Sequence, residues 1–525
     1  MAVLWWLLQL LAALVAGLWW AWLRRPRCDA PGDPPVPLLG NLMQLGNPRT
    51  SFRTLCRMHA VHGSTFCIYV GPILYVVVAE PRDAELLLGS TKIVDRTRDS
   101  PYLHNMVSVF FGDGLFSKRG DQWRAHRKII SPTFHLQILE QFLEVFNAGA
   151  EVLTKRLAAT CGQEVDLFPM VSLTTLEMIV ETAMGSTSAD DGADGGPTNR
   201  DFVAALSEAV RLMQELTVRP WLRVKWLTHL TRTGRETWRV VATLRQYGDR
   251  LVALKRRQLR SGVAADQSQS MPNKKHRLAF LDMVLSSGGG LLTSKEIYNE
   301  VYTLISAGNE TTASTISFTL ALLALHPEWQ QAVHAELDAV FGVGCEGENC
   351  HRPATPQDLA KLQVLDRVIK ETLRMFPVAP LLPRHVPHDL VLPSTGYRLP
   401  EDSMAVVFSY FMPRNASYFP EPDRFDPDRF LPENCVGRHP YCYVPFGAGL
   451  RNCVGKRYAA MQVKTLLTAV LRKFFVLPVS TMEDLHDLAL SIVIHPISGM
   501  RVVLQERHHH DHNPSPPLER ATGLM

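Results

Sequence analysis

The first strong pattern along the chain is an apolar run from Ala2 to Leu23 that only Gln9 interrupts. A run of this length can cross a bilayer as a helix. Tryptophans stand near both of its ends, as in the aromatic belts of membrane helices, at Trp5, Trp6, Trp19, Trp20 and Trp22. The pattern predicts a single transmembrane helix within residues 1–24. A cleaved signal peptide is the alternative interpretation.

Basic residues decide the expected orientation of this helix. Arg24, Arg25 and Arg27 follow the run directly, and apart from the amino terminus no positive charge precedes it. The positive-inside rule therefore predicts that the rest of the chain lies on the cytosolic side of the membrane.

The segment 25–41 is rich in proline, which fixes φ and removes backbone donors, so it predicts a stiff linker instead of a continued helix. Alternating apolar residues from Ile68 to Val78 predict a hairpin that turns at Gly71-Pro72. Helical periodicity dominates the remainder. We expect a mainly α fold with small β-sheets over residues 42–506, followed by a disordered His- and Pro-containing tail at 507–525.

Composition narrows the class of protein. With 525 residues, 46% of them hydrophobic, the chain can bury a large core. The net charge of +4 arises from 55 basic and 51 acidic residues and gives no support to a nucleic-acid partner. The nine cysteines lack paired spacing, which favours reduced thiols over a disulfide framework.

The strongest chemical signal is the loop from Phe446 to Gly455, where glycines at 447 and 449 precede a single cysteine, Cys453, just ahead of a helical pattern. Glycines allow tight turns that point N–H groups at the sulfur, and the amino terminus of a helix adds positive potential. Both effects are expected to lower the thiol pKa, so the loop predicts a reactive or metal-binding thiolate.

At these residues the chain resembles the cytochrome P450 superfamily, whose haem-binding loop has the same residue types at the positions of Phe446, Gly449, Arg451, Cys453 and Gly455. The resemblance implies the cytochrome P450 fold and a bound haem b. It implies that Cys453 is the axial ligand of the haem iron and that Arg451 faces a propionate.

Further residues carry the resemblance across the chain. Glu371 and Arg374 stand three apart on a predicted helix, and the family joins this pair to a downstream arginine, here Arg429, in a structural triad. Trp123 and Arg127, four apart on another predicted helix, are implied to face the haem propionates. The resemblance also implies, less specifically, that Arg384 faces a haem propionate.

A long helix is predicted from about Ser294 to Leu325. Thr303, Ala307, Thr311 and Thr315 recur on one face of it as a groove of small side chains, and a Thr hydroxyl can bond back to its own helix. In the family, an acid and an alcohol at the positions of Glu310 and Thr311 relay protons during oxygen activation. Many relatives carry a Glu at position 307 that can link covalently to haem; Ala307 excludes that link here.

The resemblance is strongest to the branch that contains fatty-acid omega-hydroxylases and many insect enzymes. It implies a monooxygenase of the endoplasmic reticulum membrane that inserts one oxygen atom from O2 into a lipophilic substrate, such as a fatty acid, a steroid or a foreign compound. Membrane lipid and an NADPH-dependent flavoprotein reductase are the implied partners. The alternatives are a peroxide-rearranging isomerase or dehydratase of the same fold, whose members often lose the acid-alcohol pair, and a non-catalytic haem-binding protein.

Overall fold

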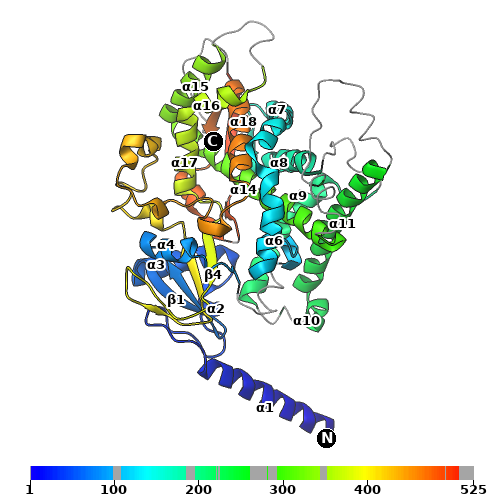
Figure 1. Ribbon diagram of the computed structural model, residues 1–525, viewed down its shortest axis with the longest axis vertical. Helices are drawn as coiled ribbons and strands as arrows, with labels where there is room; N and C mark the ends of the chain where they lie inside the picture. The colour runs from blue at the N-terminus through cyan, green and yellow to red at the C-terminus, as the bar shows by residue number, and fades with distance from the viewer. Residues whose placement is uncertain are drawn as a thin grey trace, which may run out of the picture.

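The computed structural model describes residues 2–97, 108–184, 195–219, 222, 225–260, 281, 292–342, 352–490 and 492–507. The predicted tail from 508 onward lies outside the described residues. Helices make up most of the described chain, and the strands gather mainly near the amino-terminal end of the body (Figure 1). The predicted mainly α fold with small sheets is confirmed.

The helices of the first half of the chain are α1 (Ala2–Leu23), α2 (Leu42–Leu45), α3 (Pro48–His62), α4 (Pro81–Gly89), α6 (Gly120–Ile130), α7 (Leu136–Ala158), α8 (Leu167–Met184), α9 (Asn199–Val218), α10 (Lys225–Leu230) and α11 (Arg232–Arg260). Those of the second half are α14 (Ser294–Leu325), α15 (Pro327–Phe341), α16 (Pro356–Lys361), α17 (Gln363–Met375), α18 (Lys456–Lys473) and α19 (Met482–His486).

The largest sheet has the strand order β1-β2-β7-β4 and is formed by β1 (Thr65–Val70), β2 (Ile73–Val78), β7 (Met404–Phe408) and β4 (Leu381–His385). β1 and β2 form the predicted antiparallel hairpin, with Gly71 at a φ of 60° between them. Parallel pairing of β2 with β7 and antiparallel pairing of β7 with β4 bring residues 381–408 beside the amino-terminal hairpin.

Three smaller sheets complete the strands. Their members are β3 (Glu164–Asp166), β11 (Arg501–Glu506) and β8 (Phe474–Pro478) in one sheet, β9 (Leu488–Leu490) with β10 (Ile494–Pro496), and β5 (Leu390–Val391) with β6 (Arg398–Leu399). The β9–β10 pair matters for the site, because it brings the end of the chain close to α14.

Helix α14 runs through the centre of the helical region (Figure 1) and has the bounds that its sequence predicts. A capping box between Thr293 and Glu296 begins it. Most of its residues are buried on all sides, since α8, α11, α17 and α18 pack around it. Ala307 and Thr311, in the middle of the helix, are more accessible than their neighbours and belong to the site.

Helix α1 projects away from the body beside the sheet (Figure 1). Its last turn is anchored by Trp22, which is 5% exposed and packs edge-on against Tyr69 of β1, whereas Trp5 and Trp6 are more than half exposed. Within the described ranges, no helix has the length and apolarity of a candidate membrane span. The structure thus contains the predicted amino-terminal helix, and a transmembrane role for it is not confirmed.

The proline-rich linker packs onto the body. Asp33 forms ion pairs with Arg57 and, at 2.7 Å, with His62, both on α3. These contacts, with Arg57 the larger cause, lower the pKa of the Asp33 carboxyl. These ion pairs attach the linker to α3.

Candidate active site

The loop around Cys453 is held by backbone geometry that requires glycine. Gly449 begins a short 3-10 helix with a φ of +66°, and a Cβ there would lie 1.9 Å from the carbonyl oxygen of Leu88 at the end of α4. The Cys453 amide donates to Phe446 O at 2.8 Å, which closes the loop, and α18 begins three residues later. The cysteine therefore sits where the sequence predicted it, just ahead of a helix amino terminus.

The thiol of Cys453 is surrounded by many protein atoms, yet the residue is accessible. Burial raises its pKa, and this effect exceeds the lowering by the Gly455 amide and by the charges of Arg127, Arg96 and Lys456. The expected lowering contributions are present, but the expectation of a lowered pKa for the protein alone was wrong because burial outweighs them. Coordination to a metal ion deprotonates a thiol outright.

Four arginines gather at this loop: Arg451 within it, and Arg96, Arg127 and Arg384 from other parts of the chain. Burial together with mutual repulsion lowers the pKa of Arg96 to about 10, and those of Arg384 and Arg451 to about 9. The described carboxylate nearest to the cluster, Asp95, is 3.4 Å from Arg451. The cluster therefore carries more positive charge than its protein neighbours balance.

Arg451 shows how the cluster is built. Its guanidinium lies over the ring of Trp123, 4.1 Å from the ring centroid, and donates to the carbonyls of Lys118 and Leu115. Its buried Nε has no partner among the described residues. Trp123 thus packs against the cation, while Arg127, one turn further along α6, donates to the Asn452 carbonyl and side-chain oxygens at 2.9 and 2.8 Å.

These residues fit a haem. A cysteine sulfur is a suitable axial ligand for haem iron. The unbalanced guanidinium cluster and the unpartnered Arg451 Nε suit the two carboxylates that haem carries, since buried cations require anionic partners. Arg384, the less specifically implied propionate partner, lies in this cluster and is 3% exposed.

The middle of α14 contributes the second part of the site. Ala307 is exposed although the residues around it are mostly buried, and Thr311, one turn further, is half-buried. This face of α14 therefore borders an accessible space. The Thr311 hydroxyl donates to the Ala307 carbonyl at 2.8 Å, which is the predicted bond back to its own helix, and Thr315 repeats it to the Thr311 carbonyl.

Glu310 points to a different neighbour. Its side chain is 5% exposed, and the carboxylate lies 3.0 Å from Nε2 of His495 on β10. The predicted acid and alcohol are thus adjacent in sequence, but the acid is paired with a histidine from the carboxy-terminal part of the chain.

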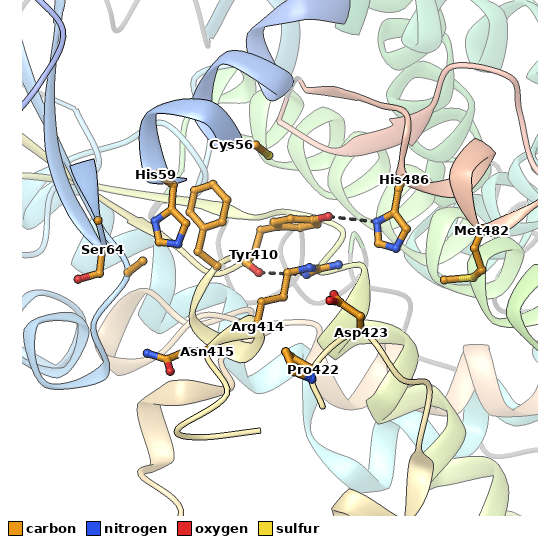
Figure 2. Close-up of a pocket in the computed structure, with 13 residues that line it drawn as sticks. Cys56, His59, Ser64, Tyr410, Arg414, Asn415, Pro422, Asp423, Met482 and His486 are labelled. Carbon is orange, nitrogen blue, oxygen red and sulfur yellow. Dashed lines mark hydrogen bonds between the residues drawn. The ribbon is translucent and has the colours of Figure 1, made fainter. Parts of the chain in front are cut away.

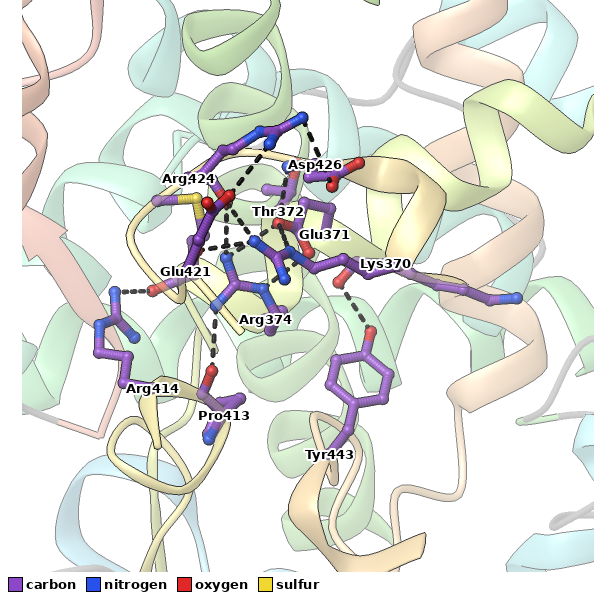
Figure 3. Close-up of polar contacts among 12 residues, drawn as sticks. Lys370, Glu371, Thr372, Arg374, Pro413, Arg414, Glu421, Arg424, Asp426 and Tyr443 are labelled. Atoms are coloured by element: carbon purple, nitrogen blue, oxygen red, sulfur yellow. Dashed lines mark hydrogen bonds and ion pairs between the residues drawn. The ribbon is translucent and has the colours of Figure 1, made fainter. Parts of the chain in front are cut away.

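The predicted triad assembles around Glu371 (Figure 3). Both of its oxygens accept from Arg374, at 2.7 and 2.9 Å, and these two side chains are fully buried. Arg429, in the short 3-10 helix Pro427–Phe430, lies 3.5 Å from the Glu371 carboxylate. The Asp426 amide donates to the same carboxylate. The triad joins α17 to the segment that precedes the Cys453 loop.

A separate cavity of about 890 Å³ lies between α3, the end of β7 and α19 (Figure 2). Arg414 stacks over Tyr410 there, and the Tyr410 hydroxyl lies 3.3 Å from His486. None of the predicted site residues lines this cavity, so it is distinct from the candidate active site.

Sequence reasoning missed two residues of the site. Arg96 stands in Asp95-Arg96-Thr97-Arg98, which reads as an ordinary solvated charge pattern, so no signal marked it. His495 is an isolated polar residue in the apolar stretch Ile492 to Ile497. That isolation was the available signal, because a polar side chain on an apolar strand needs a partner.

Comparison with known proteins gives a consistent result. Residues 30–501 match the family model described as Cytochrome P450. The chain is 34% identical over 493 residues to Cytochrome P450 4c3 of Drosophila melanogaster, covering 91% of this chain and 89% of the relative. It is 36% identical over 452 residues to Cytochrome P450 4V2 of Mus musculus, covering 85% and 82%. The predicted resemblance is confirmed.

Proposed function

The chain belongs to the cytochrome P450 family and is a monooxygenase, and we propose that it inserts one oxygen atom of O2 into a C–H bond of a lipophilic substrate. Electrons come from NADPH through a flavoprotein reductase. The observation that carries the proposal is the pairing of an accessible, deeply placed Cys453 with an unbalanced arginine cluster.

In this proposal Cys453 would bind the iron of haem b, and Arg96, Arg127, Arg384 and Arg451 would hold its two propionates. Trp123 keeps Arg451 in place by stacking. Haem, when bound, supplies the oxidation chemistry. Ala307 has no carboxyl group, so position 307 cannot form a covalent link to haem. The Glu371, Arg374 and Arg429 triad is structural and fixes the segment that leads into the Cys453 loop.

Glu310 and Thr311 deliver protons. The Thr311 hydroxyl donates its hydrogen to the Ala307 carbonyl. The lone pairs of its oxygen can therefore accept a hydrogen bond on the accessible face of α14. Glu310, which follows the exposed Ala307 by three residues, supplies the carboxyl group. Retention of this pair supports oxygen activation over peroxide rearrangement.

The proposed setting is the endoplasmic reticulum membrane, with the catalytic body, residues 42–506, on the cytosolic side. The support is the apolar helix α1, its exposed tryptophans and the arginines that follow it. The 25–41 linker joins it to the body. Arg124, Lys128, Lys456 and Arg457 are exposed beside the site and form the proposed docking surface for an acidic reductase domain.

A spin-state titration of the purified ferric protein tests the proposal. Fatty acids, steroids and other lipophilic compounds are added, and displacement of water from the iron is followed optically. A selective fatty-acid shift supports a lipid hydroxylase, and a steroid or broad response supports another lipophilic class. Product formation with the responding compound, NADPH and reductase is then required; its absence overturns the proposal.

The ligand assignment has its own test. Cys453→Ala should abolish the thiolate-type spectrum of the reduced carbon monoxide complex. Cys442→Ala is the matched control, since Cys442 is a buried thiol in the same segment with no proposed role. An unchanged spectrum in Cys453→Ala would contradict the assignment.

A further inference from the structure

The buried carboxylate of Glu310 has one hydrogen-bond partner among the described residues, and that partner is His495. The Glu310 side chain is 5% exposed and the His495 side chain is 23% exposed, with 3.0 Å between Oε1 and Nε2. A carboxylate in an apolar interior is tolerated only if it is paired. The histidine is therefore part of what allows an acid at this position.

Packing against α8 fixes the rotation of α14 that creates this contact. A Cβ at Gly308 would lie 2.2 Å from the end of the Ile179 side chain, so the two helices approach closely there. Asn309 bonds to Thr175 at 2.6 Å and to Ser172 at 3.2 Å. With Asn309 held on α8, the next residue turns by about 100° and faces β10.

The ring of His495 is also held from outside α14. Phe168 at the start of α8 meets it edge-on at 4.8 Å. Across the strand pair, His495 lies opposite Ala489. Asp166 of β3 accepts from the backbone amides of Phe168 and Met500. Nδ1 makes no hydrogen bond to a described residue, and the His495 side chain is 23% exposed.

We propose that His495 supplies protons to Glu310 from solvent, as a positioning residue of the oxygen-activation pathway. This inference rests on the proposed role of Glu310 and extends it. The ring connects a partly exposed edge with a carboxylate that water reaches poorly, and this is the arrangement that a proton entry point requires.

The proposed step transfers one proton. In the protonated ring, the N–H at Nε2 breaks and an O–H forms on Glu310, which leaves a neutral imidazole and a carboxylic acid. Glu310 passes this proton toward Thr311 and becomes a carboxylate again. The imidazole then takes up a proton from water, so each cycle moves one proton from solvent to the site.

His495→Gln tests the step, because glutamine can still donate a hydrogen bond to Glu310 but cannot carry a proton. The control is His439→Gln, since His439 pairs with Glu85 at 3.4 Å and is similarly exposed, at 26%. Peroxide released and product formed per NADPH are measured with the compound that wild type converts fastest. We expect product formation to fall by about tenfold, less than the roughly hundredfold or more that a positioned acid or base contributes.

Two further readouts are needed: an isotope effect separates proton supply from a structural role, and unfolding tests whether the two side chains interact at all. The solvent deuterium isotope effect on peroxide release should change in His495→Gln and not in the control. Thermal unfolding of Glu310→Gln, His495→Gln and the double variant should be non-additive, which reports the pair without reference to activity.

The outcomes distinguish the inference from the proposal beneath it. If Glu310→Gln releases more peroxide while His495→Gln behaves as His439→Gln does, His495 is not the proton source and the role of Glu310 stands. If Glu310→Gln forms as much product and as little peroxide per NADPH as wild type, the proposed role of Glu310 is wrong, and the inference about His495 is wrong with it.

Discussion

Replacing Glu371 by glutamine should destabilise the protein strongly, because Glu371 balances a fully buried Arg374. The substitution keeps the size of the side chain and removes its charge. One carboxylate oxygen accepts from Arg374 and from the Asp426 amide, and the other accepts from Arg374 Nε at 2.7 Å. In either orientation of glutamine, its NH2 group faces a donor, so at least one buried donor loses its acceptor.

The magnitude follows from burial. Removing one partner of a buried ion pair costs about 3–5 kcal/mol. For a chain of 525 residues, the unfolding entropy is about 1 kcal/mol per kelvin. The melting temperature should therefore fall by roughly 3–5 °C, and haem retention should fall with it, since the triad joins α17 to the segment before the Cys453 loop.

Asp366→Asn on the same helix is the matched control. Asp366 is about two-fifths exposed and pairs with Lys370 at 2.7 Å and with Lys464 at 3.5 Å. Exposed pairs contribute about 1 kcal/mol or less. Differential scanning fluorimetry of both variants and wild type gives the comparison. Equal melting temperatures for Glu371→Gln and Asp366→Asn would refute the argument that burial sets the value of this pair.

Gly449→Ala should lower both haem content and melting temperature, at a cost of about 2 kcal/mol or more, because alanine is strained at this φ and its Cβ would meet Leu88 O; full haem loading would contradict this. Thr311→Ala should raise peroxide released per NADPH, whereas Thr315→Ala, which loses the same type of helix bond, should not. His334 should make stability depend on pH: burial lowers its pKa to about 4, so the unfolded chain binds more protons between pH 6.5 and 4, and on the order of 3 kcal/mol is lost as pH falls through that window. His334→Leu should flatten this part of a melting-temperature profile, and parallel profiles would count against it.

Local patterns carried most of the correct predictions. The hairpin from Ile68 to Val78, the bounds of α14 and the glycine loop before Cys453 all depend on residues close together in the chain. The Glu371 and Arg374 pair is local in the same sense. Where spacing alone determines which side chains meet, the sequence is sufficient.

Contacts between segments that are far apart in the chain could not be predicted from local sequence patterns. His495 is 185 positions away from Glu310, and their meeting depends on how α8 rotates α14 and on the β9–β10 pair. The predicted lowering of the Cys453 pKa failed for a related reason. Helix and glycine effects can be read locally, but the burial that opposes them is a property of the folded body.

The arginine cluster shows why such a site is recognisable once it is folded. Burial, followed by the charges of Arg96 and Arg384, lowers the pKa of Arg451, so the protein places like charges together at a cost that the described carboxylates do not offset. Burial lowers the pKa of Arg96 and of Arg127, and the charge of a Cys453 thiolate opposes that lowering. The thiolate and the cations therefore stabilise each other, and under the proposed function the remaining positive charge would pair with the haem propionates. Each arginine alone resembles a surface residue, and their convergence on one loop is what indicates an anionic cofactor.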